Sequence, residues 1–217
     1  MNWKQDDNQT IAEEWANSIT HVIGAALGIA GLSALVALAA LHGDAWRVVS
    51  FSIYGGTLVL LYLASVFYHS ARSARVKHLF RIFDHAAIFL LIAGTYTPFT
   101  LVSLRGAWGW TLFGLTWGLA LAGIVLKIFF VRRFGIASTI LYLLMGWIVV
   151  IAIKPVIDAI SINGLLWLGA GGIAYTLGVV FYVWHKLPFS HAIWHIFVLT
   201  GSVLHYFAIY FYVLPMR

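Results

Sequence analysis

Seven long apolar stretches constrain this chain more than any other feature of its sequence. They cover roughly residues 18–41, 48–70, 84–104, 108–130, 136–157, 163–185 and 190–213. Each is long enough to cross a bilayer core of about 30 Å, because a helix rises about 1.5 Å per residue. Lipid offers no hydrogen-bond partner to the backbone, so every backbone N–H and C=O group must pair within the protein. These runs are too long for barrel strands. The sequence therefore predicts an all-α membrane protein, folded as a bundle of seven transmembrane helices.

Composition supports a single membrane domain over residues 1–217. Hydrophobic residues make up 62% of the chain and charged residues only 9%, far from the composition of a soluble domain. Residues 1–17 are polar and lack the basic start and cleavage site of a removable signal peptide, so we expect a cytoplasmic segment there. Because the chain has no cysteine, disulfides and thiolate metal sites are excluded, and any metal must be bound by histidine and carboxylate.

The basic residues flank the apolar runs in short loops and predict an orientation. Nine fall on the side of the N-terminus and four on the other: Lys4, Arg72, Arg75, Lys77, Arg81, Lys127, Arg132, Arg133 and Lys186 against Arg47, Arg105, Lys154 and Arg217. The positive-inside rule then predicts a cytoplasmic N-terminus and a periplasmic C-terminus. Membrane topology explains the net charge of +6 better than binding to nucleic acid does. The basic loops would instead contact anionic lipid headgroups.

Four ionisable residues converge on one membrane face in this topology. The second apolar run ends at His69, the third begins with Asp84, and the seventh begins with His191 and His195. All four are expected at the cytoplasmic side, although they are spread over more than 100 residues of the sequence. Ionisable groups within spans are costly, so their presence suggests a functional site.

Their types and spacing predict a metal site. Residues four apart share a helical face, so His191 and His195 can point inward together, and His69 would supply a third nitrogen. Zinc in catalytic sites takes three protein ligands and keeps its fourth position for water. Asp84 could act as general base toward that water or could bind the metal directly. Ser65, four residues before His69, could orient the water, polarise a carbonyl or anchor the imidazole.

A second polar stripe approaches the same face from the N-terminus. In "EEWANSITH", Glu14, Asn17 and His21 lie at i, i+3 and i+7. Glu14 and Asn17 are interpreted as groups that support the ligands or anchor the helix. His21 is interpreted as a buried hydrogen-bond partner rather than a fourth ligand.

Each residue also has a purely structural interpretation. Two histidines at this spacing are more often polar side chains at the depth of the lipid headgroups than a metal site. Asp84 could cap a helix, and Ser65 could hydrogen-bond to a helix carbonyl. Glu14 and Asn17 could be solvated residues of a surface helix. Their shared depth on one side of the membrane favours the site. His205 is excluded from it, because ten residues beyond His195 place it about 15 Å deeper.

The motifs "EEWANSITH", "SVFYH", "FDHAA" and "HAIWH" resemble those of the haemolysin III branch of the progestin and adiponectin receptor family. The resemblance covers essentially the whole chain and implies seven helices, a cytoplasmic N-terminus and zinc near the cytoplasmic face. It implies His69, His191 and His195 as ligands, Asp84 beside the zinc-bound water, and Ser65 in the site. The wider superfamily includes alkaline ceramidases. The basic residues fit a bacterial inner membrane.

Three functions follow as hypotheses. The first is a zinc hydrolase acting on a lipid amide or ester, with membrane lipids as its partners. The second is a sensor or regulator of membrane state, in which zinc only braces the bundle. The third is a pore or cytolysin, which is disfavoured because it predicts a polar stripe through the full bilayer depth, whereas the polar residues gather on one side.

Overall fold

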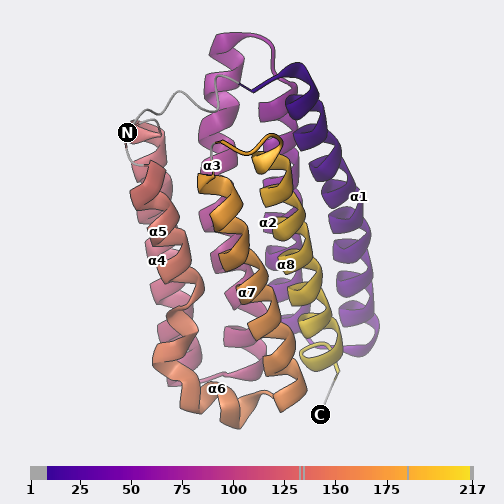
Figure 1. The fold of residues 1–217 in the computed structure, drawn as a ribbon. Helices are drawn as coiled ribbons and strands as arrows, with labels where there is room; N and C mark the ends of the chain where they lie inside the picture. The colour runs from indigo at the N-terminus through magenta and orange to yellow at the C-terminus, as the bar shows by residue number, and fades with distance from the viewer. Residues whose placement is uncertain (1–8, 132, 134, 185, 216–217) are drawn as a thin grey trace.

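The computed structural model describes residues 9–131, 133, 135–184 and 186–215, and over these it is a bundle of long helices without strands (Figure 1). The eight α-helices are α1 (Ile11–His42), α2 (Ala45–Ser70), α3 (Ala74–Pro98), α4 (Ala107–Phe130), α5 (Gly135–Gly146), α6 (Ile153–Ala159), α7 (Ile162–Val183) and α8 (Ser190–Tyr212). A π-helical turn at Phe99–Ser103 extends α3, and a 3-10 turn at Ile148–Ala152 joins α5 to α6. Together they make seven spans long and apolar enough to cross a membrane, which confirms the predicted fold class.

Short polar side chains set where several helices begin. Thr10 and Glu13 form a reciprocal capping box at the start of α1. The Asp44 side chain accepts a hydrogen bond from the backbone N–H of Arg47 at 2.9 Å, and Ser161 caps α7 through Gly164. These caps satisfy N–H groups that have no partner within their own helix.

The third span begins earlier than its hydropathy predicts. The apolar run suggests a start at residue 84, but α3 begins at Ala74 because the charged segment before the run is itself helical. Asp84 therefore lies inside a helix and is not an N-terminal cap. Arg81 and Lys127, expected in loops, lie within α3 and α4, and both are buried in the bundle.

The fifth span is broken, although its sequence predicts one continuous helix over residues 136–157. The helix stops at Gly146, and Trp147 leads into the 3-10 turn. Tyr96, from α3, bridges the break: its hydroxyl donates to the Gly146 carbonyl at 2.7 Å and accepts from the Val149 N–H at 3.0 Å. A backbone break in lipid needs such partners, because no water is there to replace the lost helical bonds.

The helices pack so that α2 lies between α1 and α3, while α8 lies beside α7 and α1. Close approach of α1 and α2 depends on Gly24, where a Cβ would come 2.5 Å from the Tyr62 ring. The start of α1, the end of α2, the start of α3 and the start of α8 all lie at one end of the bundle, which we call the histidine end (Figure 1). The arrangement thus brings the four polar segments of the sequence together.

Candidate metal centre

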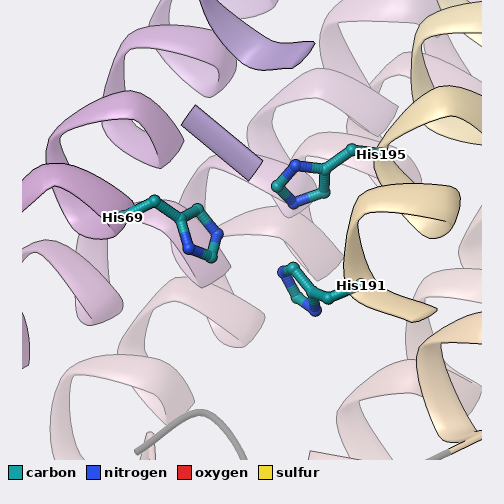
Figure 2. Close-up of side chains that lie close together, drawn as sticks. All are labelled: His69, His191 and His195. Carbon is teal, nitrogen blue, oxygen red and sulfur yellow. The ribbon is translucent and has the colours of Figure 1, made fainter. Parts of the chain in front are cut away.

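Three histidines from two helices face one another at the histidine end. His69 lies in the last turn of α2, and His191 and His195 lie in the first two turns of α8. Figure 2 shows the three rings pointing toward a common centre. Their ring centroids are 5.1 Å apart from His69 to His191, 5.1 Å from His69 to His195, and 4.6 Å from His191 to His195.

This arrangement could hold a metal ion. One nitrogen from each ring lies within 4.8 Å of the other two. Nitrogens around one tetrahedral zinc ion lie about 3.4 Å apart at Zn–N distances of about 2.1 Å, so small side-chain rotations would close the set. The structure therefore brings together the three ligands expected from sequence.

Two of the three histidines, His69 and His195, are oriented by groups on α1. Nδ1 of His69 lies 2.7 Å from a carboxylate oxygen of Glu14 and 3.4 Å from the amide nitrogen of Asn17. Nδ1 of His195 lies 3.2 Å from both the Asn17 carbonyl oxygen and the Thr20 hydroxyl. Metal-binding histidines commonly donate their second N–H to a carboxylate or carbonyl, which directs the other nitrogen, here Nε2, toward the metal.

The start of α1 also fastens the neighbouring helices around this cluster. Glu14 forms an ion pair with Lys77 on α3. A carboxylate oxygen of Glu13 accepts a hydrogen bond at 3.0 Å from the backbone N–H of Phe189, directly before α8. Asn17 is fully buried, and its amide nitrogen donates to Gln9 at 2.7 Å. Glu14 and Asn17 thus contact the ligands rather than solvent alone.

Asp84 approaches the cluster from α3. Its carboxylate lies outside the group of mutually close ligand atoms formed by the three histidines, and one oxygen is 3.5 Å from Nδ1 of His85. Asp84, His191 and His195 nevertheless line the same cavity. Asp84 therefore shares one cavity with two of the candidate ligands.

Ser65 and His21 lie close to the ligands in different ways. Ser65 is fully buried one turn before His69, and its hydroxyl has no hydrogen-bond partner among the described residues. The His21 ring stacks on His195 with 3.6 Å between centroids and 16° between planes. Neither His21 nitrogen has a hydrogen-bond partner in the described part of the chain, so the expected hydrogen-bonding role is not observed.

A cavity of about 140 Å³ begins beside the cluster and extends toward the middle of the bundle. Its wall is mainly apolar, with polar members at two levels: His21, Asp84, His85, His191 and His195 near the cluster, and Tyr96, Thr176, Tyr175 and His205 farther along. The lining given by the described residues does not include His69 and Ser65 of α2. The site therefore combines a possible metal ion, a carboxylate and an apolar chamber.

Sequence reasoning missed some of these contributors. Thr20 lies three residues after Asn17, so the helical stripe that selected Asn17 could also have selected it. Lys77 was assigned only to topology, and its pairing with Glu14 depends on the early start of α3. His205 was set aside because it cannot share an ion with His195, yet it lines the same cavity.

The chain resembles known proteins along most of its length. The family model described as haemolysin-III related matches residues 9–206. "Hemolysin-3" of Bacillus cereus is 54% identical over 207 residues, covering 95% of this chain and 94% of that protein. "Hemolysin-3 homolog" of Bacillus subtilis (strain 168) is 52% identical over 203 residues, covering 94% and 95%. The human "Monocyte to macrophage differentiation factor" is 32% identical over 212 residues, covering 94% and 85%.

Proposed function

The chain belongs to the haemolysin-III-related family of multi-pass membrane proteins, and we propose that it is a zinc-dependent hydrolase of a lipid amide or ester. The observation that carries the proposal is the three-histidine cluster beside an apolar cavity that Asp84 also lines. A purely structural metal is usually enclosed by four protein ligands, whereas three ligands beside a cavity are typical of catalysis.

The donor set fits zinc. Three imidazoles are suitable ligands, Glu14 and the Asn17 carbonyl orient two of them, and the absence of cysteine leaves histidine as the main nitrogen or sulfur donor. Zinc bound there would acidify a water molecule and polarise a substrate carbonyl.

The protein's own residues would complete the chemistry. Asp84 accepts a proton from water as the water oxygen adds to the carbonyl carbon, and it returns the proton to the leaving nitrogen or oxygen as the C–N or C–O bond breaks. The products are a fatty acid and an amine or alcohol. Ser65, one turn before His69, would orient the water or polarise the substrate carbonyl, while the apolar cavity wall would receive the acyl chain.

The proposal places this site at the cytoplasmic face, in keeping with the charge distribution of the loops. Because the chain has no cysteine, single cysteines can report on each face. Ser73→Cys at the histidine end and Ala107→Cys at the other end both replace exposed residues. A membrane-impermeant maleimide applied to intact cells should label only Ala107→Cys. Labelling of Ser73→Cys alone would reverse the orientation.

The hydrolase proposal is tested with purified protein, a fluorescent ceramide as the amide probe and a fluorescent phosphatidylcholine as the ester probe. Asp84→Asn should retain zinc but lower turnover of the accepted probe about a hundredfold or more, because proton transfer by a positioned group contributes at least that much. The matched control is Asp158→Asn, an exposed carboxylate on α6 paired with Lys154 at 3.8 Å. Unchanged turnover in Asp84→Asn would contradict the proposed role.

A second candidate is a sensor of membrane state in which the metal braces the bundle. The contacts of Glu14 with Lys77 and of Glu13 with Phe189 favour it, since they join the starts of α1, α3 and α8 around the cluster. In that case removing zinc should lower thermal stability and alter the cellular phenotype, whereas Asp84→Asn should change neither. Loss of the phenotype in zinc-loaded Asp84→Asn protein would favour the hydrolase.

A further inference from the structure

A second pocket lies at the histidine end, separate from the cavity that adjoins the candidate metal ligands. Its volume is about 410 Å³, and it lies among the start of α1, the α2–α3 connection and the first turns of α3. Its wall is largely polar and is formed mainly by Gln9, Glu14, Arg72, Lys77, His78 and Arg81. The residues described around the larger cavity include none of these six. This end of the bundle therefore has a polar pocket of its own.

The basic residues of α3 in this pocket share one face of the helix. Lys77 and Arg81 are four residues apart, and His78 and Arg81 are three apart, spacings that place side chains together. The opposite face carries apolar side chains, among them Val76 and Phe83, which are 43% and 52% exposed. The charged face is therefore distinct from the face that would meet acyl chains.

Tyr68, near the end of α2, positions two of the cations. Nζ of Lys77 lies 5.2 Å and Cζ of Arg81 5.7 Å from the centre of its ring, distances at which a cation is attracted to an aromatic face. Nε and Nη2 of Arg81 each donate to the Tyr68 hydroxyl at 3.3 Å. Arg81 is buried, whereas the Lys77 side chain is 20% exposed and Arg72 and His78 are exposed. A ligand can therefore reach the pocket's outer basic groups.

The pocket has an excess of positive charge. Among the described residues, its wall contains the cations of Arg72, Lys77 and Arg81 and one carboxylate, that of Glu14. Both oxygens of this carboxylate already contact other groups: one pairs with Lys77, and the other lies 2.7 Å from Nδ1 of His69. Like charges held close together repel one another, so an anion in the pocket would be stabilised. Guanidinium groups in particular match the geometry of phosphate oxygens.

We propose that this pocket binds a phosphate group. The proposal goes beyond the hydrolase, because the three histidines and Asp84 are not among the residues described around the pocket. Two sources would supply the same chemistry: the headgroup of an anionic phospholipid in the adjacent leaflet, and free phosphate. Either would form charge-assisted hydrogen bonds with Arg72 and Lys77.

Binding to the purified full-length protein tests the pocket with two probes. Dioleoylphosphatidylglycerol is compared with dioleoylglycerol, which lacks the phosphate, by native mass spectrometry, and inorganic phosphate is titrated by calorimetry at constant ionic strength. The wild type should bind at least one phosphate probe. Arg72→Gln should weaken that binding about fivefold, the contribution expected of one basic residue near an anionic membrane surface. Arg72→Lys, which keeps the charge, should recover part of the loss.

Arg75→Gln is the matched control. It removes the same charge from an exposed residue three positions away, which is not among the residues that line the pocket, and it should weaken binding less than Arg72→Gln does. Unfolding midpoints equal to that of the wild type show that both variants are folded.

The two probes distinguish the sources of the phosphate. Preference for phosphatidylglycerol without binding of inorganic phosphate would assign the pocket to a lipid headgroup, and binding of inorganic phosphate would assign it to free phosphate. Failure of the wild type to bind either probe, or an equal loss in Arg72→Gln and Arg75→Gln, would overturn the proposal, since the second result is that of general surface charge. Because binding is measured without turnover, the outcome does not depend on the hydrolase.

Discussion

The two ends of the bundle are built from the same kinds of helices but are stabilised in different ways. At the histidine end, imidazoles and Asp84 line a cavity, and Glu14 and Asn17 contact His69 and His195. The opposite end is packed with apolar side chains that are almost fully buried, including Leu35, Ala39, Phe51, Val156, Ile209 and Val213. The histidine end contains polar groups that need partners, whereas the opposite end is filled by closely packed apolar side chains. The candidate metal centre therefore lies at the end where apolar packing is interrupted by polar groups.

Arg47 secures the opposite end. Its guanidinium donates to the carbonyl oxygens of Val213, Leu214 and Pro215 and forms a 3.0 Å ion pair with Asp44. These carbonyls follow or end α8, where no helical N–H remains to satisfy them. The same helix therefore begins with metal-ligand candidates and ends in a structural clamp, so substitutions at its two ends should affect different properties.

The largest expected effect is loss of the metal from His191→Ala. Removing one of three ligands should lower zinc affinity by more than a hundredfold, because changes even in the groups that support ligands typically lower it 10–100-fold. Metal content of the purified protein, measured by plasma mass spectrometry, checks this. His42→Ala, at the far end of α1, should retain wild-type zinc. Equal zinc in His191→Ala and the wild type would remove the metal site and with it the contrast between the two ends.

A smaller loss is expected from Glu14→Gln. The amide keeps the shape of the side chain but loses the charge that orients His69 and pairs with Lys77. Zinc affinity should fall about 10–100-fold, measured by competition with a chelator. Glu13→Gln, which changes the adjacent carboxylate, is the matched comparison and should have the weaker effect on zinc. The reverse ranking would show that fastening α8, rather than orienting His69, determines affinity.

At the opposite end, Arg47→Ala should change stability and leave zinc binding intact. Loss of the charged hydrogen bonds to the end of α8 should lower the free energy of unfolding by about 1–2 kcal/mol. Thermal unfolding in a fixed detergent measures the shift, and zinc content reports on the other end. A loss of zinc in Arg47→Ala would mean that the two ends are coupled through α8.

The sequence was sufficient for the features that depend on local pattern. Run lengths predict the seven spans, and the four-residue spacing of His191 and His195 predicts their shared face, which the structure confirms. The break in the fifth span was not predictable from its own residues, because the groups that satisfy it come from Tyr96 on another helix.

The early start of α3 was missed for a related reason. Hydropathy marks where a helix enters the apolar layer, whereas α3 begins ten residues earlier, in a charged segment. Asp84 therefore lies inside the helix, although its sequence position also allowed an N-terminal cap. The same shift placed Lys77 where it can pair with Glu14. The cavity position of His205 depends on how α7 and α8 pack, which spacing along one helix does not reveal.

The smallest expected effect is the pH dependence contributed by Asp44 at the clamped end. Partial burial raises the pKa of this carboxyl group. The Arg47 N–H and the charges of Arg47 and Arg105 together lower it by more than burial raises it, so the net pKa lies below its ordinary value. Such a group stabilises the fold above its unfolded pKa of about 3.9 and loses that contribution as the pH falls through the folded pKa. Since the side chain is 36% exposed, solvent screening limits the effect to about 0.5 kcal/mol or less.

Comparing the wild type with Asp44→Asn isolates this contribution. Their unfolding midpoints should differ slightly at pH 6 and converge as the pH is lowered toward 3, while zinc content at pH 7 stays equal. A difference that instead grew on acidification would mean that the folded state binds the proton more tightly than the unfolded chain, and burial would then outweigh Arg47 and Arg105. The clamp would in that case depend on the carbonyl contacts of Arg47 alone, which Arg47→Ala measures separately.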